Sequence, residues 1–180
     1  MNGTKLAGGP TQDEIMAVSL FKLGLLSTDT VLEIGCGTGK VSVAMSKTVK
    51  KVYSLDKRPD AISLATETAW NAGVHNIEFF CTDAMDFLTN DLVFDCAFLG
   101  GTKHLAEILP VLAKKVKRTI VINAVMVSTL ERAVTALKEL GIFTEVVQVQ
   151  VSRSYNIAGS IMFKPIDPVY IIVARGAACS

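Results

Sequence analysis

The residues with the clearest chemical pattern form a short loop between an apolar segment and a helical one. In residues 31–40 (VLEIGCGTGK), three glycines alternate with other residues directly after a β-branched, apolar run. Glycine has no Cβ, so this loop can turn tightly and bring its backbone close to a ligand. The first turn of the following helix adds amide donors and the positive end of a helix dipole. The sequence predicts a cofactor-binding loop.

The spacing of the glycines indicates which cofactor. A dinucleotide loop has the pattern G-x-G-x-x-G, whereas here Lys40 stands at the last position and Gly39 comes one residue early. The Gly-Lys-Ser/Thr ending of a P-loop is also missing. Glu33 would repel a pyrophosphate but suits a cofactor with an ammonium or sulfonium group. We therefore expect S-adenosylmethionine, bound by Glu33, Gly35, Cys36, Gly37, Thr38 and Gly39.

One acidic residue is placed to bind the ribose of this cofactor. Asp56 ends the second predicted strand, about twenty residues after the first glycine. In doubly wound folds this position meets the ribose hydroxyls, and a carboxylate can accept from both. The alternative is a surface acid that caps the helix beginning at Pro59. The position at a strand end favours ribose binding.

Strands and helices alternate along most of the chain. We expect strands at residues 30–34, 51–55, 77–81, 93–99 and 119–124. Capping boxes at residues 11–14 and 128–131 predict two helix starts, and Pro110 should kink or break the helix that contains it. This alternation predicts a parallel sheet with helices on both faces.

The end of the chain departs from this alternation. Residues 143–151 and 169–174 are predicted strands with no helix between them, so they should pair antiparallel. Their connection is much longer than a hairpin loop of about 2–5 residues, which indicates a binding loop or an interface element. The prediction is one α/β domain over residues 1–180. Its doubly wound, Rossmann-like sheet is mostly parallel and seven-stranded, with an antiparallel final strand pair.

Composition excludes several classes of protein. Half of the 180 residues are hydrophobic, and 18 basic against 17 acidic residues leave a net charge of +1, without a basic footprint for nucleic acid. The four cysteines form no Cys-x-x-Cys pair, so we expect reduced thiols and no metal site. No segment resembles a signal peptide or is long enough to cross a membrane. We expect a cytoplasmic protein without membrane or nucleic-acid partners.

With these motifs, the chain resembles the class I S-adenosylmethionine-dependent methyltransferases over essentially its whole length. The resemblance implies that Asp83 and Ala84, after the third strand, bind the adenine, although Asp83 could instead cap a helix. It also places substrate at Gly100 and Gly101, after the fourth strand. Methylases of base nitrogens carry an acidic or Asn residue, prolines and an aromatic there. Two glycines argue against that reaction and favour a bulky substrate.

A narrower resemblance is to the cobalt-precorrin C15-methyltransferase (decarboxylating) family of cobalamin biosynthesis. It rests on Gly9-Pro10-Thr11, on the glycine loop, on Gly100-Gly101 and on Arg153…Gly159…Met162…Pro168-Val169. It implies a tetrapyrrole substrate, Thr11 near the methionine part of the cofactor, and a homotetramer paired through the long hairpin. The family usually has a second arginine after its sixth strand, whereas this chain keeps Arg153 alone.

The implied chemistry needs no catalytic residue of the protein, and we name none. A carbon of the macrocycle attacks the methyl group, and the enzyme aligns the two. Tetrapyrrole intermediates carry carboxylates, so Lys103, Arg153 and Lys164 are candidate anchors. His75 and His104 are predicted surface residues, with an acid/base role open for His104. The alternatives are another class I methyltransferase (small molecule, protein carboxyl or tRNA) and a non-catalytic cofactor-binding module.

Overall fold

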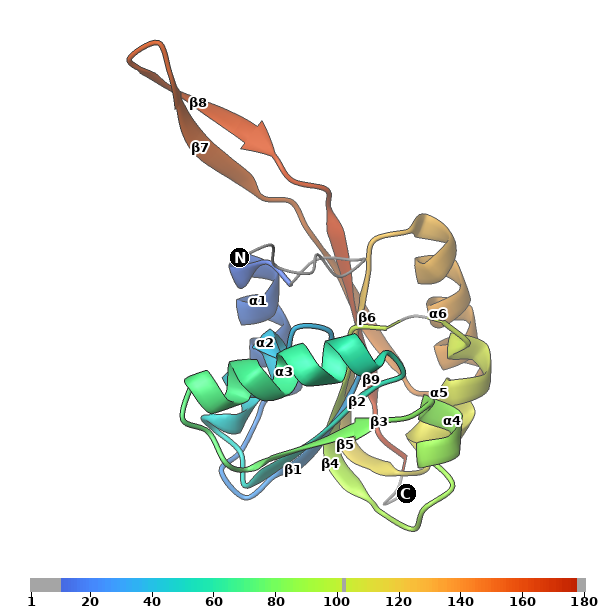
Figure 1. Cartoon of the computed structure of the whole chain (residues 1–180). Helices are drawn as coiled ribbons and strands as arrows, with labels where there is room; N and C mark the ends of the chain where they lie inside the picture. Colours follow the sequence, from blue (N-terminus) through green and yellow to red (C-terminus); the bar gives the residue numbers. More distant parts are fainter. Residues whose placement is uncertain (1–10, 102, 178–180) are drawn as a thin grey trace.

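A computed structural model describes residues 11–101 and 103–177 as a seven-stranded sheet between two layers of helices (Figure 1). The strand order is β3-β2-β1-β4-β5-β9-β6. Strands β1 to β5 run parallel, and β9 is antiparallel to both β5 and β6. The strands of this sheet are β1 (Thr30–Ile34), β2 (Lys51–Asp56), β3 (Ile77–Cys81), β4 (Phe94–Leu99), β5 (Val116–Ala124), β6 (Phe143–Val149) and β9 (Val169–Arg175). The predicted fold class is confirmed.

The helices form one layer on each face of the sheet. The α1, α2 and α3 helices lie on one side, and α4, α5 and α6 lie on the other (Figure 1). Their bounds are α1 (Asp13–Leu23), α2 (Lys40–Ser46), α3 (Pro59–Asn71), α4 (Ala84–Phe87), α5 (Leu105–Ala113) and α6 (Val127–Glu139). The strand order reverses between β1 and β4, and ligands of open α/β sheets bind beyond the carboxyl ends of the strands at such a point.

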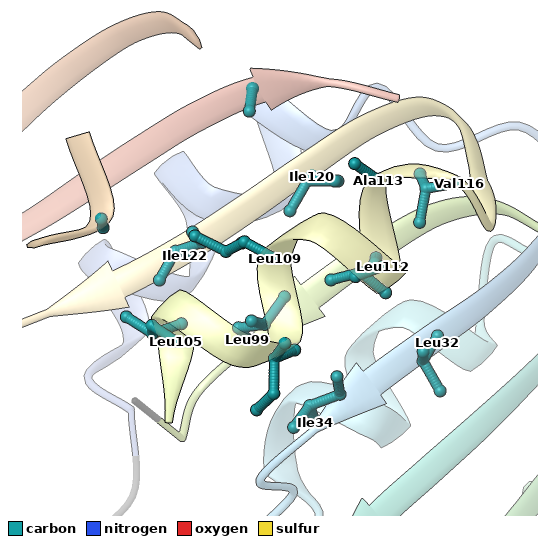
Figure 2. Close-up of a cluster of buried hydrophobic side chains, with 14 of the residues drawn as sticks. Leu32, Ile34, Leu99, Leu105, Leu109, Leu112, Ala113, Val116, Ile120 and Ile122 are labelled. Carbon is teal, nitrogen blue, oxygen red and sulfur yellow. The ribbon is translucent and has the colours of Figure 1, made fainter. Parts of the chain in front are cut away.

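The larger core cluster fixes the ends of β1 and β4 against α5. Figure 2 shows Leu105, Leu109 and Leu112 of α5 over side chains of β1, β4 and β5. These leucines are at most 5% exposed, and Leu32 and Leu99 beneath them are fully buried. Burying a leucine side chain stabilises a fold by roughly 1.5–3 kcal/mol. The core therefore fixes β1 and β4, the two strands between which the strand order reverses, and with them the loops that follow both strands.

On the opposite face, the core contains a buried polar cluster. Glu33 is 1% exposed, and its Oε2 accepts hydrogen bonds from Ser42 of α2 and, at 2.6 Å, from Ser54 of β2. The two serine oxygens also lie 2.8 Å apart. Burial raises the pKa of Glu33 from its ordinary 4.5 to about 6, against the lowering effect of both serines.

Most predicted boundaries agree with the structure, but both capping boxes are wrong. The N-caps of α1 and α6 are Gln12 and Met126, and neither makes a side-chain capping bond. Glu14 pairs with a distant arginine instead of closing a box with Thr11. Pro110 lies inside α5 and does not end it, so the predicted break is also wrong.

The fifth strand starts three residues earlier than its apolar run, at Val116. Two charged residues follow in the strand and have partners there: Lys117 Nζ lies 3.2 Å from Asp95 Oδ1, and Arg118 Nη2 lies 2.6 Å from Asp29 Oδ2. Ion pairs therefore extend the strand beyond the hydrophobic pattern.

The long connection between β6 and β9 is a separate hairpin of β7 (Ser152–Ile157) and β8 (Ser160–Pro165). It projects away from the body of the protein (Figure 1), and every residue of both strands is exposed. Ala158 (φ 47°) and Gly159 (φ 78°) form its two-residue turn, and positive φ at both positions is typical of a tight hairpin. The predicted loop is thus a regular extended arm.

The Glu33 cluster predicts a specific pH dependence of stability. Because the pKa of Glu33 is raised from 4.5 to about 6 in the fold, its stabilising effect is present below about pH 4.5 and lost as pH rises through about 6. Relative to Glu33→Gln, the free energy of unfolding of the wild type should fall by about 2 kcal/mol between about pH 4 and about pH 8. Urea denaturation across this range measures the difference.

The control is Glu131→Gln, at an exposed position on α6, whose stability should run parallel to the wild type. A difference between wild type and Glu33→Gln that stays constant with pH would contradict the raised pKa of Glu33.

Candidate functional site

A cavity of about 590 Å³ opens at the carboxyl ends of β1, β2, β3 and β4. Its size is within the range of small-molecule sites. Its walls come from four strand ends and from the start of α5. The lining residues are Ile34, Gly35, Leu55, Asp56, Lys57, Arg58, Thr82, Asp83, Ala84, Gly100, Gly101, Lys103, His104 and Ile108.

Two glycine segments meet at the floor of this cavity. Gly35 has φ 83°, and a Cβ there would lie 2.5 Å from the Gly101 amide nitrogen. A Cβ on Gly100 would lie 2.9 Å from the Gly35 carbonyl oxygen. No side chain fits between the two loops, so the predicted cofactor loop and the predicted substrate loop are in direct backbone contact.

Hydrogen bonds to β2 and within the loop hold the glycine loop in place. The amides of Gly35 and Cys36 donate to the Leu55 carbonyl of β2 at 2.8 and 2.9 Å, and the Gly39 amide donates to the Cys36 carbonyl at 2.9 Å. A Cβ on Gly39 would lie 2.8 Å from Ala65 Cα, so this glycine permits close packing on α3. Cys36, Gly37, Thr38 and Gly39 are not among the lining residues.

Glu33, a predicted cofactor-binding residue, does not line the cavity. Side chains alternate along β1, so Ile34 and Glu33 point to opposite faces of the sheet. The Glu33 carboxylate is buried against α2 and is not part of the cavity wall. The neighbouring Cys36 thiol is equally unavailable, since burial raises its pKa far above the ordinary range.

Asp56 lines the cavity and has well-defined partners. Its Oδ1 accepts from the Arg58 amide (3.1 Å) and from Arg58 Nε (3.0 Å). Its Oδ2 accepts from Arg58 Nη2 (2.9 Å) and from the Gly37 amide (3.1 Å). Burial would raise the pKa of Asp56, but the bonds from Arg58 and Gly37 outweigh it and lower the pKa. The carboxylate is therefore ionised and tied to the glycine loop.

Asp83 and Ala84 lie together at the far wall of the cavity. Asp83 is the N-cap of α4, and its Oδ1 accepts from the Met85 amide at 3.0 Å. The capping role is thus present, and the residue still lines the cavity. A carboxylate has two oxygens, so capping by Oδ1 leaves Oδ2 for a ligand donor.

Several basic residues surround the opening. Lys57, Arg58 and Lys103 line the cavity beside His104, which has a left-handed backbone (φ 57°) as N-cap of α5. The His104 Nδ1 lies 3.6 Å from Glu107 Oε1. Thr102 lies outside the described residues. Of these residues, Lys57 and Arg58 were missed in the sequence, although their place directly after Asp56 was a usable signal.

Two other predicted residues lie outside the cavity wall. Arg153 Nη2 on the hairpin bonds to Glu14 Oε2 on α1 at 2.8 Å. The Thr11 carbonyl accepts from Lys40 Nζ at 2.9 Å, which brings Thr11 to the glycine loop. Gly9 and Pro10 are outside the described residues. Lys164 is exposed on β8, opposite Arg153.

These residues fit the predicted cofactor. The cavity combines the ionised Asp56 carboxylate at the end of β2, the Asp83 side chain at the end of β3, and glycine backbone between them. Such a site can hold ribose hydroxyls at Asp56 and adenine at Asp83 and Ala84. Among the described residues, no group of three or more His, Cys, Asp or Glu could hold a metal ion. No helix of residues 11–101 and 103–177 is long and apolar enough to span a membrane.

Comparisons with known proteins place the chain in a family. A family model described as a precorrin methyltransferase domain matches residues 5–175. A protein of Methanosarcina mazei named probable cobalt-precorrin-6B C(15)-methyltransferase (decarboxylating) is 46% identical over 176 residues, which cover 94% of this chain and 95% of the relative.

Two solved structures are also similar. The precorrin-8W decarboxylase of Methanobacterium thermoautotrophicum has TM-score 0.89 and 27% identity, with 92% of this chain and 91% of the other covered. The precorrin-6y C5,15-methyltransferase of Geobacter metallireducens has TM-score 0.89 and 28% identity, with coverages of 96% and 94%. The chain therefore belongs to the precorrin methyltransferase family, and its methyl donor is S-adenosylmethionine.

Proposed function

We propose that the protein transfers a methyl group to C15 of a cobalt-precorrin and removes carbon dioxide from an acetate side chain of the same substrate. The observation that carries this proposal is the 46% identity to a relative of that name over nearly the full length of both chains. The cavity supports it, because Gly100 and Gly101, directly after β4, present backbone rather than side chains to the cavity. A large, flat substrate can approach such a wall closely.

The residues of the chain bind and align the reactants. Bound S-adenosylmethionine supplies an electrophilic methyl group. Asp56 accepts from the ribose hydroxyls, and Asp83 and Ala84 bind the adenine. Gly100 and Gly101 leave room for the macrocycle, and Lys103 attracts its carboxylates. Alignment of a carbon nucleophile with the methyl group, with water excluded, can supply much of the rate.

We also propose the predicted homotetramer, in the cytoplasm, with the hairpin as the pairing element. Its large apolar residues are 43–69% exposed: Tyr155, Ile157, Ile161, Met162 and Phe163. The strand register puts Tyr155 beside Met162 on one face and Phe163 beside Ser154 on the other. An isolated two-stranded hairpin is at best marginally stable in water, so contacts from other subunits on both faces would stabilise it. The Arg153–Glu14 pair holds its base against α1.

The decisive test of function is incubation with methyl-labelled cofactor and a cobalt-precorrin substrate, followed by mass analysis of the tetrapyrrole. We expect the gain of one labelled methyl group and the loss of one carbon dioxide. Transfer of label to tRNA, a protein carboxyl or a small molecule instead would favour another class I methyltransferase. Cofactor binding without any transfer of label would indicate a non-catalytic module.

Asp56→Ala should weaken cofactor binding by about 1.5 kcal/mol, roughly tenfold, because charge-assisted hydrogen bonds to the ribose are lost. Calorimetry with S-adenosylhomocysteine, which cannot transfer a methyl group, measures this affinity. Asp86→Ala serves as control, since Asp86 is exposed on α4 and is not a lining residue. Equal affinities for Asp56→Ala and wild type would remove Asp56 from the cofactor site.

The double substitution Ile161→Ser, Phe163→Ser should reduce the size of the assembly, because it removes apolar side chains that are 69% and 67% exposed. Sedimentation velocity measures the effect. Trp70→Ser is the matched control, as it removes a 77% exposed aromatic on α3. If the double variant sediments like the parent, the hairpin is not the pairing element.

A further inference from the structure

The Asp56 carboxylate already has a full set of hydrogen-bond donors from its own chain. A carboxylate offers about four acceptor positions, and four donors between 2.9 and 3.1 Å reach Asp56. Three of the four belong to Arg58, whose Nε and Nη2 contact both oxygens in a bidentate pair. A ribose that donates two hydroxyl protons to Asp56 must therefore replace existing donors.

The four donors differ in how easily they can leave. The amides of Gly37 and Arg58 belong to the backbone, in the glycine loop and at the N-cap of α3. Their removal would disturb the ends of β1 and β2. The Arg58 guanidinium sits on a flexible side chain that is 38% exposed, whereas the Asp56 side chain is 5% exposed. The guanidinium is thus the side-chain donor of the set, and its exchange leaves both backbone amides bonded to Asp56.

We propose that Arg58 exchanges partners during binding. The cofactor ribose displaces its guanidinium from Asp56, and the guanidinium then binds a carboxylate of the second substrate. Arg58 lines the cavity together with Lys57 and Lys103, so the released group remains at the opening that the substrate uses. A guanidinium is well suited to bidentate binding of a carboxylate. The second half of the proposal rests on the proposed polycarboxylate tetrapyrrole substrate.

The exchange implies that Arg58 lowers the affinity for the cofactor and raises the affinity for the substrate. While Arg58 occupies Asp56, it competes with the ribose, so removal of a positively charged lining residue should strengthen cofactor binding. The same removal should weaken substrate binding, because one carboxylate loses its partner. Arg58 would thus couple the two sites, with cofactor binding first and substrate second.

The test compares Arg58→Met with wild type. Methionine keeps the length of the side chain and the backbone amide donor but removes the guanidinium. By calorimetry, Arg58→Met should bind S-adenosylhomocysteine about two- to fivefold more tightly, since a partly exposed ion pair no longer competes. Because this probe has no sulfonium and no net charge near pH 7, the lost positive charge does not by itself favour binding. In the Asp56→Ala background, Arg58→Met should give no gain.

Lys50→Met is the control, since Lys50 is an exposed cation outside the cavity lining, and its affinity for the probe should equal that of the wild type. In the turnover assay, Arg58→Met should raise the KM for the tetrapyrrole severalfold with a smaller effect on kcat. Unchanged or weaker binding of the probe by Arg58→Met overturns the exchange, as does an unchanged KM. If no label is transferred by wild type but the probe binds more tightly to Arg58→Met, the proposed function fails while the displacement of Arg58 by ribose stands.

Discussion

The site depends on a backbone contact between the ends of β1 and its two neighbours. The Ile34 carbonyl accepts from the amides of Gly100 and Gly101 at 2.9 and 3.1 Å, and the Leu55 carbonyl accepts from the amides of Gly35 and Cys36. These bonds tie β4 and β2 to the glycine loop. The bonds to Gly100 and Gly101 need a residue without a Cβ at position 35, because a Cβ there would lie 2.5 Å from the Gly101 amide nitrogen. The cavity is the space that this contact leaves at the switch point of the sheet.

Much of the fold could be predicted because its signals are local. Apolar runs marked β1 and β2 within a residue or so, since buried parallel strands need continuous apolar sequence. The errors arose where a distant partner decided the structure. Glu14 bonds to Arg153 rather than to the helix start, and Lys117 and Arg118 extend β5 through pairs with acids on other segments. Such partners are far away in sequence and carry no local pattern.

The position of the site in the fold could be predicted from the sequence, but the directions in which its side chains point could not. Residues at strand ends line the cavity as expected, among them Asp56, Asp83 and Lys103. Glu33 precedes the loop by two residues, yet the alternation of side chains along β1 turns it into the core beside Ser42 and Ser54. Arg58 was missed for the converse reason. Its proposed role depends on the contact between its guanidinium and Asp56. That contact is set by side-chain rotamers, which neither composition nor periodicity reveals.

The pKa values of the two acids near the glycine loop are shifted in opposite directions by their surroundings. Burial raises the pKa of Glu33 to about 6, and the negative charge of Asp56 adds to this effect. Hydrogen bonds from Arg58 and Gly37 lower the pKa of Asp56 despite its own burial. Between about pH 4 and about pH 6, the negative charge therefore lies mainly on Asp56, at the cavity wall, and above about pH 6 Glu33 is ionised as well. In our proposal that the ribose binds Asp56, its neutral hydroxyls compete with Arg58 for this carboxylate, and the strength of this one ion pair contributes to cofactor affinity.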